Sequence, residues 1–167
     1  MVTYGLTKEY CIKKSFLKGF KQRLIDQYWQ EWHNKIETKD RYKDYKTFKE
    51  NHGEEAYLKT ITVTKFRKIL TKCRLGILDI QSNKRFSNVS KDLKCPICNQ
   101  EEENEMHILF KCPCYNYLRQ KYISKHWPNN NFTSLKDILS TQEEDKLKDL
   151  SMFLFYSMKR KDYMMNI

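Results

Sequence analysis

The chain has 167 residues, 40% of them hydrophobic, which is enough for one compact domain or for two small helical units that share a core. Its formal net charge is +11, and the excess is uneven: residues 1–90 carry 20 basic against 10 acidic side chains, whereas residues 91–167 carry 12 against 11. No signal peptide opens the sequence, and its longest apolar stretch, 150–158, is about half of a membrane span, so we expect an intracellular protein with no membrane partner.

The uneven charge suggests what the basic half contacts. A basic half beside a nearly neutral half is typical of a protein whose surface faces a polyanion, most often RNA or DNA. A solvated lysine-rich surface is the alternative, because the whole sequence is rich in Lys, Asn, Tyr and Ile. The positions of the basic side chains on the predicted helices therefore distinguish these two interpretations.

Gly and Pro are scarce, at four and three residues, which permits long helices, and alternating strand patterns are weak throughout. We therefore expect a mainly α fold, a small helical domain with little or no sheet. Between residues 15 and 36 apolar side chains recur every three or four positions, which predicts a helix of about six turns with a wide aromatic stripe. Residues 1–60 are interpreted as an amphipathic helical lead-in, and we expect most of the stripe to be core.

The second strong helix prediction covers residues 64–75. Thr62 or Thr64 can cap its start, and Gly76 can end it. One face of this helix is apolar, and a second face carries lysines at positions i, i+3 and i+7. The side chains expected to hold phosphates come from this helix and from the polar connection after it: Lys65, Arg67, Lys68, Lys72, Arg74, Lys84 and Arg85.

A compact motif with the spacing Cys-x2-Cys-x8-His-x4-Cys follows, and its members are Cys95, Cys98, His107 and Cys112. Three thiolates and one imidazole suit tetrahedral Zn²⁺, and four protein ligands leave no position open for a catalytic water. We therefore predict one structural zinc ion. Cys114 is the alternative fourth ligand, and plain buried thiols beside a surface His are the alternative to a metal site.

Residues 61–130 are interpreted as the basic helix plus this zinc module, continued by a helix that starts at Pro113 and reaches about residue 126. A break at 127–131 separates this unit from the C-terminal helices, residues 131–167. A short helix there is expected to end at Leu139, and a capping-box pattern at 141–144 predicts the start of a long last helix.

The run 94–122 resembles the C-terminal zinc-binding (CCHC) region of non-LTR (LINE-type) retrotransposon reverse transcriptases. The shared pattern is Cys-Pro-x-Cys, an acidic stretch, Glu-x-His-x-Leu-x-x-Cys-Pro-x-Tyr and then Leu-Arg, all present within residues 95–119. The sequence of the basic helix upstream also resembles that family, so the resemblance covers about residues 64–122.

The resemblance implies a helical zinc module that contacts RNA or DNA, with the remainder of a retroelement polyprotein as a partner and with nuclear residence. The chain has no polymerase carboxylate motif and no endonuclease domain, so no catalysis is carried over from the family. The leading hypothesis is a non-catalytic zinc module that binds nucleic acid. A structural or protein-interaction remnant is the alternative, and a metal-dependent nuclease is disfavoured because the zinc ligand set is closed.

Overall fold

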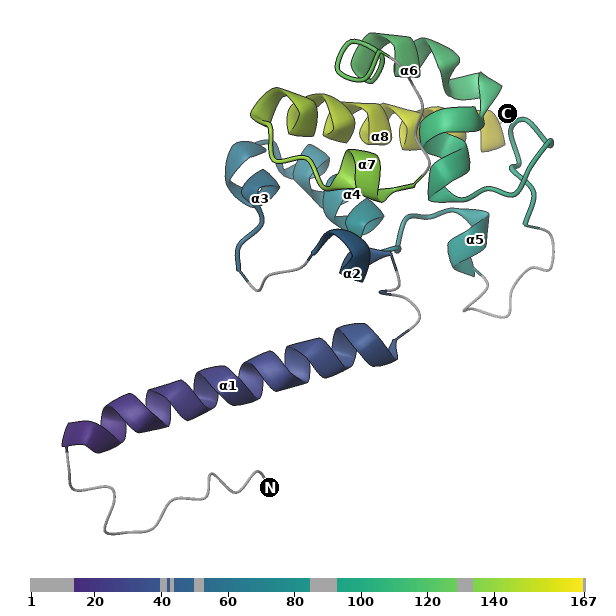
Figure 1. The fold of residues 1–167 in the computed structure, drawn as a ribbon. Helices are drawn as coiled ribbons and strands as arrows, with labels where there is room; N and C mark the ends of the chain where they lie inside the picture. The colour runs from purple at the N-terminus through teal and green to yellow at the C-terminus, as the bar shows by residue number, and fades with distance from the viewer. Residues whose placement is uncertain are drawn as a thin grey trace. The chain divides into compact units, whose positions relative to one another are not determined.

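The computed structural model describes residues 14–39, 42, 44–49, 53–84, 93–128 and 134–166. This part of the chain is mainly helical, as predicted (Figure 1). Its one pairing of extended segments is an isolated antiparallel bridge between Lys94 and Glu102. None of the helices found there combines the length and the apolar character that a membrane crossing requires. The chain divides into an N-terminal unit, Met1–Lys43, and a C-terminal unit, Asp44–Ile167.

In the N-terminal unit the structure describes one long helix, α1 (Lys14–Thr38). The helical segments of the C-terminal unit are α2 (Tyr45–Phe48), α3 (Ala56–Thr60), α4 (Thr64–Arg74), α5 (Gln81–Lys84), the π-helix η4 (His107–Lys111), the 3-10 helix η5 (Pro113–Tyr115), α6 (Asn116–Tyr122), α7 (Lys136–Leu139) and α8 (Glu144–Met165).

Helix α1 confirms the helix predicted from the periodicity of residues 15–36. The expectation that most of its apolar stripe is core is wrong at four positions, where Leu17, Leu24, Ile25 and Tyr28 are 37% to 70% exposed. A single helix cannot cover its own apolar stripe, and α1 is the only long helix of its unit among the described residues. The sequence pattern therefore identified the helix correctly but not its surroundings.

The core of the C-terminal unit forms around α8. Helices α3, α4 and α6 all pack against α8, and α2 packs against α7. The buried side chains of α8 recur every three or four residues, as an amphipathic helix requires. Helix α8 contributes Leu147, Leu150, Phe153 and Leu154 to the core. Helix α4 adds Leu70 and Cys73, and η4 adds Ile108 and Leu109.

This core crosses both domain boundaries that the sequence suggested. Phe48 of α2 and Tyr57 of α3 precede the predicted boundary at residue 60, yet both belong to the same core as α4. Helix α8, placed among separate C-terminal helices, is the element that α4 and α6 share. The structure thus divides the chain near residue 43, not at residues 60 and 130.

Two predicted helix starts differ in detail from the structure. Val63 occupies the N-cap position of α4 without a side-chain cap, so neither Thr62 nor Thr64 caps this helix. Helix α8 begins after Glu143, which makes no side-chain cap either; its backbone N–H instead donates to the Thr141 hydroxyl at 3.4 Å. Acidic side chains in the first turn of α8 complement the positive end of the helix dipole, which the capping-box pattern had also placed there.

The predicted end of α4 at Gly76 is confirmed. Gly76 has a φ of 61°, in the left-handed region that glycine adopts without a Cβ clash. Its N–H donates to the Cys73 carbonyl at 3.1 Å, and the N–H of Ile77 donates to the Lys72 carbonyl at 2.9 Å. These two bonds form a Schellman motif, which satisfies two of the carbonyls in the last turn of the helix.

Candidate metal centre

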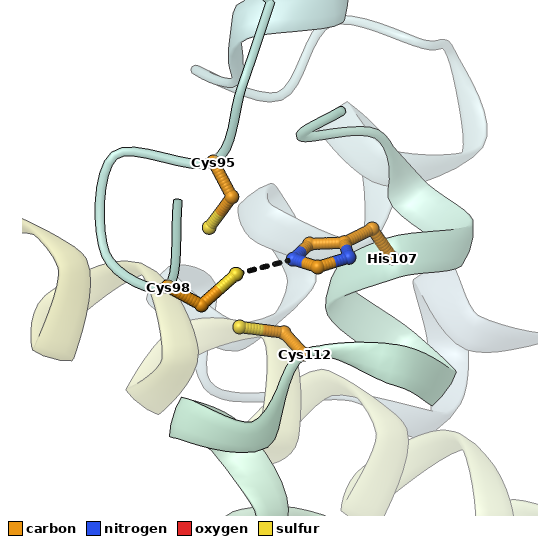
Figure 2. Close-up of side chains that lie close together, drawn as sticks. All are labelled: Cys95, Cys98, His107 and Cys112. Atoms are coloured by element: carbon orange, nitrogen blue, oxygen red, sulfur yellow. Dashed lines mark hydrogen bonds between the residues drawn. The ribbon is translucent and has the colours of Figure 1, made fainter. Parts of the chain in front are cut away.

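The first two cysteines of the motif sit on a tight turn. The Asn99 N–H donates to the Cys95 carbonyl at 2.9 Å, and Asn99 itself has a φ of 56°, which reverses the chain after Cys98. The Cys95 N–H then donates to the Glu101 carbonyl at 2.8 Å, which pairs the segments before and after the turn. The turn therefore presents both sulfur atoms to the same side (Figure 2).

The other two members of the motif are placed by a π-helix. The backbone N–H of His107 donates to the Asn104 side-chain oxygen at 2.8 Å, which fixes the start of η4. The N–H of Cys112 donates to the His107 carbonyl at 2.7 Å, a bond across five residues. This wider turn brings residues five apart closer to alignment than an α-helix does, so both side chains point toward the cysteine turn (Figure 2).

The four side chains form one compact donor group. Their ligand atoms, three Sγ atoms and one imidazole nitrogen, all lie within 4.8 Å of one another, and Nε2 of His107 is 3.3 Å from Sγ of Cys98. Cys95, His107 and Cys112 are buried, and Cys98 is half-buried. Adjacent sulfurs of a tetrahedral site with bonds of about 2.3 Å are about 3.8 Å apart, so the group can close around a metal ion with little movement.

The structure thus brings together the four residues that the motif predicted. Cys114, the alternative fourth ligand, is half-buried and lies outside this donor group. The intervening Pro113 begins the 3-10 helix η5, which turns the chain away directly after Cys112. The path of the backbone therefore places Cys112, and not Cys114, in the donor group.

The second ring nitrogen of His107 faces an acidic side chain. Nδ1 is buried with no hydrogen-bond partner among the described residues, and the nearest carboxylate oxygen, Oε2 of Glu101, is 3.6 Å away. Lys111 lies 3.3 Å from the same oxygen and, by hydrogen bonding, lowers the pKa of the Glu101 carboxyl. A carboxylate on this side favours the tautomer with a proton on Nδ1, which leaves Nε2 free to bind a metal.

The thiols of Cys95 and Cys112 lie close enough to shift each other's pKa in opposite directions. A hydrogen bond from the Cys112 thiol lowers the pKa of Cys95, and donating this bond raises the pKa of Cys112. A divalent ion between the two sulfurs would displace the proton of this hydrogen bond, because metal binding requires thiolates. The closeness of these two sulfurs is therefore compatible with both of them binding one divalent ion as thiolates.

Arg119 of α6 supports the centre from outside the motif. Its side chain is only 7% exposed and donates to the carbonyl oxygens of Leu109 at 2.7 Å, Cys112 at 3.1 Å and Ile108 at 3.3 Å. The last carbonyls of a helix otherwise lack partners, so Arg119 caps η4 and holds the backbone of Cys112. Its position in the Leu-Arg part of the motif was visible in the sequence, but its role was not.

A buried ion pair ties α8 to residues 99–106, which join Cys98 to His107 in the candidate donor group and are called the metal-binding loop below. The Glu103 carboxylate is fully buried and lies 2.7 Å from the Lys161 ammonium, which also donates to the Asp79 carbonyl at 2.7 Å. The same carboxylate accepts the Gln81 N–H at 2.8 Å. Lys161 lies one turn before the end of α8 at Met165, and its side chain is buried in the unit.

The residues predicted to bind phosphate fall into different environments. Lys65, Lys68 and Lys72 are exposed on α4, as expected. Arg67 is half-buried, and its guanidinium donates to the Leu58 carbonyl at 3.3 Å. Lys84 is the last residue of α5, and Arg85 lies outside the described residues.

Arg74 does not belong to the exposed basic face. It is 2% exposed, its guanidinium lies 3.0 Å from the Glu55 carboxylate, and it also donates to the Leu139 carbonyl. The guanidinium carbon is 4.7 Å from the centre of the Phe48 ring, so aromatic packing encloses it as well. The prediction that Arg74 holds a phosphate is therefore wrong, because its charge is satisfied inside the C-terminal unit.

Comparison of the chain with protein-family models, with curated proteins and with solved structures finds no match. The resemblance to the zinc-binding region of retrotransposon reverse transcriptases therefore depends on the motif residues alone.

Proposed function

We propose that the donor group holds one Zn²⁺ and that the C-terminal unit is a non-catalytic zinc module that binds RNA or DNA. The observation that carries the zinc proposal is the convergence of Cys95, Cys98, His107 and Cys112 within 4.8 Å. Three sulfurs and one imidazole nitrogen are the donors that favour zinc over hard cations. Four protein ligands fill a tetrahedral shell, so the ion would stabilise the fold and would not activate water.

A zinc ion at this position would join separate stretches of the unit. The cysteine turn, η4 and the start of η5 all supply donors, and Arg119 connects the last of these to α6. The pair between Glu103 and Lys161 extends the connection to α8. In small zinc modules the ion supplies about 10 kcal/mol or more of folding free energy, which is comparable to the whole stability of an average domain.

Support for nucleic-acid binding comes from the lysines of α4. Lys65, Lys68 and Lys72 are exposed, and within the described part of the chain Lys68 and Lys72 have no carboxylate at ion-pair distance. Lysines in this arrangement bind phosphates and supply affinity without reading sequence. Because α4 packs on α8, which the Lys161 pair connects to the metal-binding loop, the basic face and the metal centre share one core.

The test is a fluorescence-anisotropy titration of a labelled single strand at several salt concentrations, with zinc and again after chelation. Three phosphate contacts predict a log–log salt slope near −2, and chelation should weaken binding because α4 loses its support. The variants Lys68→Gln and Lys72→Gln should each reduce the slope by about 0.7. Lys35→Gln is the control, because this exposed lysine lies on α1 and is paired with Glu31 at 3.4 Å.

The second candidate, a protein-interaction or structural remnant, is favoured by the exposed apolar side chains of α1. A folded, zinc-loaded protein that does not bind any strand would support this candidate and would overturn nucleic-acid binding. Self-association measured by sedimentation, and reduced by Leu17→Gln and Tyr28→Gln together, would identify α1 as the surface responsible.

A further inference from the structure

The C-terminal unit carries a cluster of aromatic side chains at its surface where α4, α6 and α8 meet. We call Phe66, Phe155, Tyr156 and Tyr122 the aromatic cluster. The ring centres of Phe66 and Phe155 are 5.2 Å apart, and those of Phe155 and Tyr156 are 5.4 Å apart. Tyr156 stacks on Tyr122 with the planes only 9° apart. Tyr156 is 38% exposed, and Phe66 and Phe155 are half-buried, so these rings are accessible from outside.

Lysines surround the cluster. The Lys65 ammonium lies 5.1 Å from the centres of both the Phe66 and the Phe155 rings, and the Lys159 ammonium is 5.5 Å from Phe155. Lys121 lies 5.2 Å from the Tyr122 ring on α6. Among the described residues none of the three lysines has a carboxylate at ion-pair distance, so their charge is available to an anionic partner.

A hollow of about 200 Å³ adjoins the cluster and shares Phe66 with it. Its wall is mostly apolar, formed by Ile61, Val63 and Met152 beside that ring. Pockets for drug-sized ligands are larger, about 300 to 1,000 Å³, so this one suits a single flat ring system. An accessible ring, a small apolar hollow and unpaired cations therefore occur together on one surface.

We infer that this surface binds single-stranded nucleic acid, with unpaired bases stacked on Tyr156 and Phe66 and with phosphates held by Lys65 and Lys159. The inference rests on the proposed nucleic-acid function and assigns its substrate class. Aromatic rings bind single strands because every unpaired base has a face that can stack, whereas the bases of a duplex are already stacked on each other. The lysines alone would bind a duplex equally well, so the rings are what favour the single strand.

The experiment compares a labelled 12-nucleotide single strand with a duplex of the same length, by anisotropy at fixed salt, on the zinc-loaded full chain. Tyr156→Ala should lower the affinity for the single strand about tenfold, should leave the salt slope unchanged and should leave duplex binding within about twofold. Tyr156→Phe keeps the ring and should keep the affinity. Tyr117→Ala is the matched control, because Tyr117 is a 70% exposed tyrosine of α6 outside the cluster.

The outcomes separate this inference from the proposed function. Binding to neither strand would overturn both. Binding in which Tyr156→Ala behaves like Tyr117→Ala, or in which the duplex binds as tightly as the single strand, would overturn the aromatic surface while nucleic-acid binding stands.

A second measurement avoids any loss of stability in the Tyr156→Ala variant. A single strand that contains 5-iodouracil is irradiated with the wild-type protein, and the cross-linked peptides are identified by mass spectrometry. Cross-links to Phe66 or Tyr156 are expected. Cross-links that map only to other aromatic residues would contradict the inference.

Discussion

At the scale of single residues, Arg119 supports the backbone of one member of the candidate donor group, Cys112. The arginine donates to three carbonyl oxygens, one of them that of Cys112, so it fixes the backbone from which this sulfur projects. Side chains that orient metal ligands typically change metal affinity 10- to 100-fold when they are lost. We therefore expect metal affinity to depend also on residues outside the donor group, such as Arg119.

The variant Arg119→Met tests this role of the arginine. It leaves three buried carbonyls without their donor, so we expect the free energy of unfolding to fall by about 3 kcal/mol and the zinc affinity to fall at least tenfold. Urea unfolding of the zinc-loaded protein and competition with a metal indicator measure the two effects. Arg160→Met, at an exposed position of α8, should change stability by less than about 0.5 kcal/mol. Equal effects of the two variants would show that Arg119 does not support the metal centre.

A pair of cysteine variants tests the assignment of the fourth ligand. Cys112→Ser should reduce zinc affinity more than about 100-fold, because it removes a ligand and not merely a support. Cys114→Ser should retain zinc, because this sulfur lies outside the donor group. The zinc content of each variant is measured after dialysis. Loss of zinc from Cys114→Ser but not from Cys112→Ser would identify Cys114 as the fourth ligand.

At the scale of elements, the sequence predicted several helices and their ends for identifiable reasons. Gly76 ended α4 as expected, because the left-handed backbone conformation after a helix has a strong residue preference. The π-turn of η4 could not be predicted, since the same apolar pattern fits an α-helix. The exposure of Leu17 and Tyr28 could not be predicted either, because periodicity identifies the apolar face of a helix but not the elements that pack against it.

Gly76→Ala tests the end of α4. A Cβ at a φ of 61° is sterically unfavourable, so the substitution should lower the free energy of unfolding by about 1 kcal/mol. Gly19→Ala is the matched control, because Gly19 lies inside α1 with no other atom within 4 Å of an added Cβ, and alanine there should increase helicity. Circular dichroism during denaturation measures both. A stabilising effect of Gly76→Ala would contradict the left-handed cap.

At the scale of the whole molecule, the C-terminal unit is held together by contacts between residues far apart in the sequence. Lys161 of α8 meets Glu103 of the metal-binding loop, and Arg74 of α4 meets Glu55 next to α3. Arg74 was predicted from the sequence to hold a phosphate at the surface, which is the usual environment of Lys and Arg. Only the tertiary packing decides which members of a basic segment turn inward, so this part of the structure could not be predicted.

Lys161→Met tests the connection between α8 and the metal-binding loop. The substitution leaves the Glu103 carboxylate buried without its cation, and we expect a loss of about 3 to 5 kcal/mol. Lys148→Met is the control, because its 2.5 Å pair with Glu144 is exposed and such surface pairs contribute little to stability. Chemical denaturation of both variants gives the comparison. A small effect at Lys161 would mean that the buried pair does not hold the loop to the helix.

The most direct test of the central claim is native mass spectrometry of the purified full chain, combined with thermal unfolding before and after chelation. We expect one zinc ion per chain, absent from Cys112→Ser, and a marked fall in both helical signal and melting temperature when the metal is removed. A metal-free protein whose melting temperature and helical signal do not respond to chelation would contradict the claim that zinc organises the C-terminal unit.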